Sequence, residues 1–281
     1  MIFLSQLRGE LRKLFARRRT YIGYIVFLVF EVLMLTLWMR ILRPKVEELA
    51  ERNLIPVDQL YSSLTATYWI MGWSMFFLGS IYFALVAGDI VAKEAEDGNL
   101  RMVLARPVSR LRVLLLKYVA VIIYTVTFVI FVGATGYGMS VIAMGTEGGL
   151  FVWNPEMFIL AAYPEWSDGF TRLFIGACFM GLSMCVVSSL GFCFSCMKMK
   201  PAAATIMALS VFFVDMVLQN IPFMMDFKEN FITFRMAAWV YLMAEDIPWA
   251  RVYESYAILG GINLTLFIIG WMTFQSRDFK T

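Results

Sequence analysis

The chain has 281 residues, of which 60% are hydrophobic and only 16% are charged, and its mean hydropathy is +0.73. Soluble domains are nearer half apolar and a quarter charged, so this composition excludes an ordinary soluble protein and indicates a membrane protein. The net charge of +3 is small and dispersed, which argues against nucleic-acid binding. The absence of histidine excludes zinc proteases with paired histidines and serine–histidine catalysis.

The first 20 residues predict an amphipathic helix that lies in the membrane interface. Leucines recur there at helical spacing, at Leu4, Leu7, Leu11 and Leu14, while arginines take the other faces. The alternative is a simple cytoplasmic extension of the first span. The segment has no uninterrupted apolar core before a small-residue cleavage site, so no cleaved signal peptide is expected.

Six later stretches are apolar enough to cross a membrane, which takes about 20 mostly apolar residues. They cover residues 21–42, 68–87, 114–143, 173–194, 202–221 and 256–274. The loop 222–255 mixes apolar and polar residues in stretches too short to span, which favours short helices at the outer face. The sequence therefore predicts an all-α membrane protein in which residues 1–281 form one transmembrane domain.

Lysine and arginine gather in alternate connections, which sets the expected orientation because these residues stay on the cytoplasmic side. The N-terminal stretch, the loop 88–112, the loop after the fourth span and the C-terminal tail are basic. The other three connections are rich in acidic residues, and the second and third of them are also rich in aromatic residues. We therefore expect a multi-pass protein of the plasma (inner) membrane with both termini in the cytoplasm.

The loop 88–112 has a more ordered pattern than a solvated loop needs. It predicts a short charged helix that ends at Asp97-Gly98, followed by apolar Leu100 and Leu104, which require a partner. Pro107 breaks the chain and Ser109 can cap the next helix. This loop is a candidate docking surface, and the alternative is a solvated, positively charged connection.

This loop resembles the corresponding loop of ABC-2 family permeases, which reads acid, any, acid, any, Gly-Thr-Leu, then Pro-Val-Ser-Arg and a later Lys. The matching residues here are Glu94, Glu96, Gly98, Leu100, Leu104, Pro107, Val108, Ser109, Arg110 and Lys117. Asn99 stands where threonine is usual. The order of segments and the ending Arg277-Asp278-Phe279-Lys280 are also similar, so the resemblance covers nearly the whole chain.

The resemblance implies the membrane permease of an ATP-driven ABC exporter that acts as a homodimer or with a closely related second permease. Two copies of a separate ATPase would bind ATP and Mg, because this chain has no Gly-x-x-x-x-Gly-Lys-Ser/Thr loop. No catalytic residue, cofactor or metal is expected in the chain itself. The residues implied in ATPase coupling are Glu94, Glu96, Gly98, Leu100, Leu104, Pro107 and Arg110.

Two acidic residues fall inside predicted spans, where a carboxylate is costly and often functional. Glu31 lies in the first span and Asp215 in the fifth, where Gln219 and Asn220 extend a polar strip. These four residues are candidates for a translocation path. The alternative is a structural hydrogen bond to a neighbouring helix.

Three other interpretations stay open at this stage. A non-transporting membrane anchor or assembly factor would recruit a cytoplasmic partner through the same loop. An ion-driven carrier would use Glu31 and Asp215, although the docking-like loop argues against it. A soft-metal route would use sulfur ligands on the fourth span, where ordinary apolar packing is the simpler reading, at Cys178, Met180, Met184 and Cys185.

Overall fold

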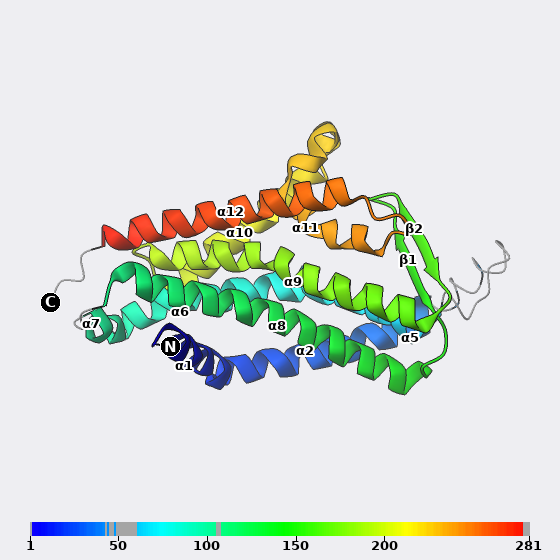
Figure 1. Cartoon of the computed structure of the whole chain (residues 1–281), viewed down its shortest axis with the longest axis horizontal. Helices are drawn as coiled ribbons and strands as arrows, with labels where there is room; N and C mark the ends of the chain where they lie inside the picture. The colour runs from blue at the N-terminus through cyan, green and yellow to red at the C-terminus, as the bar shows by residue number, and fades with distance from the viewer. Residues whose placement is uncertain (1, 43, 45–47, 49–60, 105–107, 278–281) are drawn as a thin grey trace.

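The computed structural model describes residues 2–42, 44, 48, 61–104 and 108–277. Within these ranges six helices are long and apolar enough to cross a membrane, at Arg18–Ile41, Ser63–Glu96, Arg110–Met144, Trp166–Cys196, Pro201–Gln219 and Trp249–Gln275. They run along the long axis of the molecule (Figure 1). The predicted all-α membrane fold with six spans is confirmed. We call the end that carries α1 and α7 the terminal end, and the opposite end the hairpin end.

The centre of the bundle consists of the second, third and fourth spans. These are α5 (Ser63–Trp73) with η2 (Ser74–Gly79) and α6 (Ser80–Glu96), then α8 (Arg110–Met144) and α9 (Trp166–Cys196). Gly191 lets α9 approach α6 closely, since a Cβ there would lie 2.9 Å from the Ala84 carbonyl oxygen. The apolar window of the fourth span is 72% buried, against 17% for α10 (Pro201–Gln219) and 22% for α12 (Trp249–Gln275). The outer spans therefore expose apolar faces to lipid or to another subunit.

The N-terminal helix is separate from the first span. α1 (Ile2–Ala16) ends before Arg17, whose extended backbone (φ −69°, ψ 135°) turns the chain into α2 (Arg18–Leu37), and η1 (Trp38–Leu42) follows. The Thr20 hydroxyl donates a hydrogen bond of 2.7 Å to the Leu14 carbonyl oxygen across this corner. Leu14 is buried and Leu4 is exposed. The leucine face thus packs largely on the protein, above all on α8, rather than in the acyl boundary as expected.

The second span is longer than predicted and passes straight into the candidate docking loop. The charged segment before Asp97 is the last part of α6 and not a helix of its own. Gly98 then adopts φ +75°, a left-handed conformation that ends the helix, and α7 (Asn99–Leu104) begins. The separate short helix of this loop is therefore α7, which lies after the predicted stop at Asp97-Gly98 rather than before it.

The hairpin end contains a feature that the sequence did not predict. β1 (Leu150–Asn154) and β2 (Ile159–Tyr163) pair antiparallel, with Val152 opposite Ala161. The Phe151 amide donates a hydrogen bond of 2.9 Å to the Thr65 hydroxyl, and Ser62 bonds the Gly149 carbonyl oxygen. The hairpin is thereby joined to the start of α5.

Short helices precede the last span, as predicted for residues 222–255. They are η3 (Pro222–Asn230), α11 (Ile232–Met236) and η4 (Ala237–Met243). In Figure 1, η3 projects from the side of the bundle, whereas η4 packs against α9. The last span begins at Trp249, seven residues earlier than predicted.

Candidate functional site

A buried lysine joins three helices at the terminal end. The Lys117 Nζ on α8 lies 3.0 Å from a Glu10 carboxylate oxygen on α1 and 2.7 Å from one of Glu94 on α6. Lys117 is only 3% exposed, and the two carboxylates are largely covered. Arg17 and Lys13 add further basic groups at 4.0 Å from Glu94 and 2.7 Å from Glu10. The cluster therefore fastens α1, α6 and α8 to one another.

The acidity of Glu10 reflects this arrangement. Burial by itself would raise the pKa of the Glu10 carboxyl, but the charge of Lys117 and the hydrogen bonds from Lys13 and Lys117 oppose it. The outcome is a pKa below the ordinary value of 4.5. Glu10 is thus ionised at neutral pH and remains a partner of Lys117.

Two of the predicted coupling residues face the interior rather than a partner. Glu94 is held by Lys117, and Leu100 is only 1% exposed within the core. Both side chains thus have partners within the chain itself, and their role in ATPase coupling stays a prediction. Both residues hold the α6–α7 corner in place. The sequence pattern identified Lys117, but its partner Glu10 lies 107 residues earlier in the chain.

The outward side of the same corner is made of other residues. Glu96 and Asp97 at the end of α6 are exposed, and Met102 on α7 is 66% exposed. Leu104 is the last residue of α7, and Pro107 lies outside the described residues. The outward side of the corner therefore combines two exposed acidic side chains with an exposed methionine.

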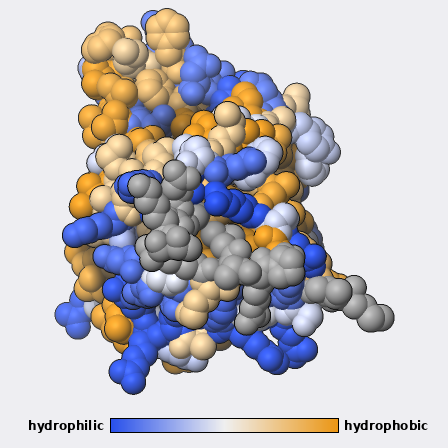
Figure 2. Space-filling model, turned by 90° about the vertical axis from the view of Figure 1, so that its left-hand side faces the viewer, coloured by the Kyte–Doolittle hydropathy of each residue, from blue (hydrophilic) through white to orange (hydrophobic). Residues whose placement is uncertain are grey.

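A groove of about 840 Å³ separates this corner from the turn between α1 and α2. Five basic side chains line one part of it, at Lys13, Arg17, Arg18, Arg19 and Lys93. Asp97, Asn99 and Met102 line the other part, and Arg19 is ion-paired with Asp89. Figure 2 shows hydrophilic residues gathered on this face of the molecule. The terminal end therefore presents a hollowed, strongly charged surface.

Arg110 serves the end of the last span. Its guanidinium Nη1 donates hydrogen bonds of 2.9 Å to the Gln275 carbonyl oxygen and 3.0 Å to that of Arg277. Ser109 caps α8 as predicted, accepting a bond from the Arg112 amide at 3.4 Å. Arg110 thus links the start of α8 to the end of α12.

Glu31 lies between the first and third spans and is fully buried. The Thr135 hydroxyl on α8 donates a hydrogen bond of 3.0 Å to its Oε1. Its Oε2 has no hydrogen-bond partner among the described residues. Glu31 therefore makes an interhelical contact, and the described side chains contribute no cation to it.

Asp215 on α10 has a different environment, because its carboxylate contacts the start of α11. It accepts hydrogen bonds from the Ile232 amide at 3.2 Å and from the Thr233 amide and hydroxyl, each at 2.7 Å. Such a carboxylate satisfies amides that have no partner within the helix. The hydrogen bonds attach the short helices 222–243 to α10.

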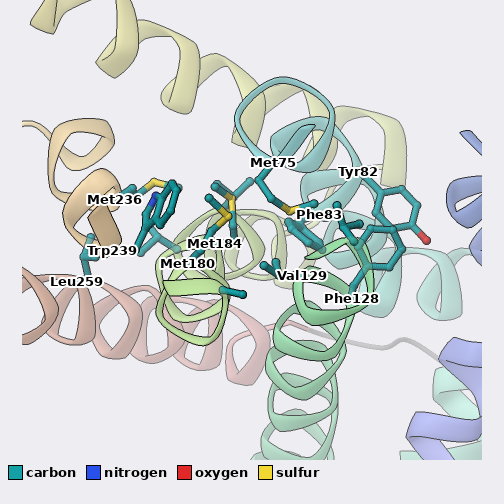
Figure 3. Close-up of a cluster of buried hydrophobic side chains, with 14 of the residues drawn as sticks. Met75, Tyr82, Phe83, Phe128, Val129, Met180, Met184, Met236, Trp239 and Leu259 are labelled. Carbon is teal, nitrogen blue, oxygen red and sulfur yellow. The ribbon is translucent and has the colours of Figure 1, made fainter. Parts of the chain in front are cut away.

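Gln219 and Asn220 lie at the end of α10 and differ in how far they are buried. Asn220 is exposed and donates to the Met216 carbonyl oxygen at 2.8 Å, whereas Gln219 is buried. Gln219 lines a cavity of about 490 Å³ between α5–η2, α9, α10 and α11–η4. Figure 3 shows Trp239 and Met236 beside Met180 and Met184, which also line this cavity. Asn220 lines the same cavity, so both residues of the predicted polar strip reach it.

The sulfur-containing residues of α9 do not form a cysteine cluster. Cys178, Cys185, Cys193 and Cys196 are all free thiols, spread along the helix. Within the described ranges no three or more histidine, cysteine, aspartate or glutamate residues come together as metal ligands. Met180 and Met184 instead belong to the buried hydrophobic cluster.

Comparison with known proteins agrees with the fold. Residues 6–233 match the family described as ABC-2 family transporter protein, a match that spans α1, the first five membrane helices and the start of α11. No curated protein sequence matches the chain. The chain therefore belongs to the ABC-2 transporter family and is a multi-pass membrane permease.

Proposed function

We propose that this permease is the membrane subunit of an ATP-driven exporter and that a separate ATPase docks at its terminal end. The observation that carries the proposal is the α6–α7 corner. Glu96, Asp97 and Met102 are exposed there, while Glu94 anchors the same corner to Lys117. A contact surface is thus built directly onto the end of a membrane span.

This arrangement is suited to transmitting movement. A partner that displaces α7 acts on α6, which packs along α9, and through Glu94 and Lys117 on α8. Glu10 extends the connection to α1. Because closely packed helices shift as units, movement at the corner changes the arrangement of the central spans.

The partners follow from the same reasoning. ATP and Mg bind to the ATPase, of which two copies serve a homodimer or a pair with a closely related permease. The exposed apolar faces of α2 and α10, such as Ile25, Val29 and Val214, are available for that pairing. Both termini lie in the cytoplasm of a plasma-membrane protein, and Arg110 holds the last span at this side.

The decisive variant is Met102→Asp, which places a charge on the exposed surface of α7. Tagged protein is purified under mild conditions from its native membrane, and the bound ATPase is identified by mass spectrometry and quantified. We expect at least about a fivefold loss of bound ATPase, because a buried unpaired charge costs about 1 kcal/mol or more at an interface. Glu96→Lys should weaken the same contact.

The matched control is Met225→Asp on η3, another methionine that is 57% exposed but far from the corner. It should retain the ATPase. Equal retention by Met102→Asp, Glu96→Lys and wild type would overturn the docking assignment. Capture of a partner without ATPase activity would instead support the membrane-anchor alternative.

A further inference from the structure

The cavity at the hairpin half of the bundle has the size and walls of a ligand site. Its volume of about 490 Å³ falls within the usual range for small-molecule pockets, roughly 300 to 1,000 Å³. Aromatic rings line it from five segments, including Trp73 on α5, Phe76 on η2, Phe212 on α10, Phe234 on α11 and Trp239 on η4. Flat aromatic walls favour an aromatic guest, because offset and edge-on ring contacts are attractive.

One residue of the lining has a buried polar atom with no hydrogen-bond partner among the described residues. Gln219 is only 7% exposed, and its side-chain Oε1 makes no hydrogen bond to any described residue. Buried amide oxygens are nearly always hydrogen-bonded, so this one requires an explanation. A donor on a bound molecule would complete it.

The charge of the lining selects against ions. Glu156 is the acidic residue of the lining, and its carboxylate lies 3.4 Å from the Lys228 Nζ. Among the described residues, no lysine or arginine lines the cavity. An anion would lose its hydration without meeting a cation in this lining, and a cation would find the Glu156 carboxylate already paired with Lys228.

We infer that this cavity binds an uncharged aromatic molecule that donates one hydrogen bond to Gln219 Oε1. That such molecules are the transported substrates rests on the proposed function, whereas their binding to the cavity requires no ATPase. A lipid chain would fill the apolar volume but leave Gln219 unsatisfied. The hydrogen-bond donor therefore distinguishes this ligand class from bilayer lipid.

The test uses full-length protein in lipid nanodiscs and the probe 1-aminoanthracene, with 1-methylanthracene as the probe of similar shape that lacks the donor. Saturable energy transfer from tryptophan to each probe is measured against empty nanodiscs. Wild type should prefer the amine by about fivefold, the value of a hydrogen bond of about 1 kcal/mol. Gln219→Leu should abolish this preference while retaining binding of 1-methylanthracene.

A second pair of variants tests the cavity without touching Gln219. A Cβ on Gly72, which lines the cavity, would meet no atom within 4 Å, so Gly72→Leu adds its side chain to empty space. It should abolish binding of both probes. Gly138→Leu is the matched control, because Gly138 has the same open surroundings on α8 but does not line the cavity.

Each outcome decides the question. Equal affinity of wild type for the two probes, a preserved preference in Gln219→Leu, or unchanged binding in Gly72→Leu overturns the inference. Absence of saturable binding, as when lipid or a second protomer fills the cavity, also overturns it. ATPase retention is measured on Gly72→Leu in parallel, so loss of the ligand site is distinguishable from loss of the docking site.

Discussion

At the scale of single residues, Lys117 is the position at which one change should matter most. Lys117→Met leaves the carboxylates of Glu10 and Glu94 close together and without their shared cation. Removing one partner of a buried ion pair costs roughly 3 to 5 kcal/mol, and the partial exposure of the two acids favours the lower value. We expect a clear fall in the unfolding midpoint. The measurement follows reaction of the buried thiols of α9 with a thiol-reactive fluorophore.

The control for this experiment is Lys198→Met, since Lys198 is exposed and no ion pair is found for it among the described residues. Its free energy of unfolding should match that of wild type within about 0.5 kcal/mol. The combination Lys117→Met with Glu10→Gln and Glu94→Gln should recover part of the loss, because it removes the unpaired charges. No difference between Lys117→Met and Lys198→Met would contradict the network.

Glu10 also predicts a pH dependence. Its pKa in the folded protein lies below 4.5, so its ion pairs contribute stability above that pH. The contribution is lost as the pH falls below 4.5 toward the folded-state pKa. Protection of the amides of residues 2–16, measured as exchange rates corrected for the intrinsic pH dependence of exchange, should therefore be high at neutral pH and fall in this acidic window. Glu10→Gln should show low protection at neutral and acidic pH alike, and a wild type that loses protection at alkaline rather than acidic pH would refute the assignment.

At the scale of elements, the attachment of the short helices 222–243 depends on Asp215. Asp215→Ala removes three hydrogen bonds to the start of α11 and should cost about 1 kcal/mol. Limited proteolysis and hydrogen exchange should show a loosened segment 222–243 with the central spans unchanged. Asp215→Asn keeps one hydrogen-bond acceptor, so protection of segment 222–243 in this variant should lie between that of wild type and that of Asp215→Ala. Unaltered protection in Asp215→Ala would show that packing of η4 alone holds the segment.

The elements also show what the sequence could predict. Spans follow from apolar length, and α1 follows from its leucine spacing, because both patterns are local. The hairpin was missed since its strands are five residues each and are fixed by contacts with α5. The hydrogen bonds of Asp215 could not be foreseen, because its partners at Ile232 and Thr233 are brought near only by the fold, and its place on a translocation path stays a prediction. The ion pair of Glu94 with Lys117 was unforeseen for the same reason, because only the fold brings the two residues together.

At the scale of the whole molecule, the arrangement of the ends predicts topology. Six spans bring α1 and the end of α12 to the same side of the bundle, with the hairpin on the other (Figure 1). In a background without the four cysteines, single cysteines at Glu156 and Asp246 should react with an impermeant reagent in intact cells. A cysteine at Glu96 should react only after lysis. The opposite pattern would invert the proposed orientation and remove the cytoplasmic docking site.

The Lys117 cluster also has a consequence for biosynthesis. Glu10 leaves the ribosome 107 residues before Lys117, which is about 5 to 20 s at usual translation rates. During that interval α1 cannot form its ion pair with α8, because the third span has not yet been made. Closure of the ion cluster then fixes the α6–α7 corner while the last three spans are still to be made.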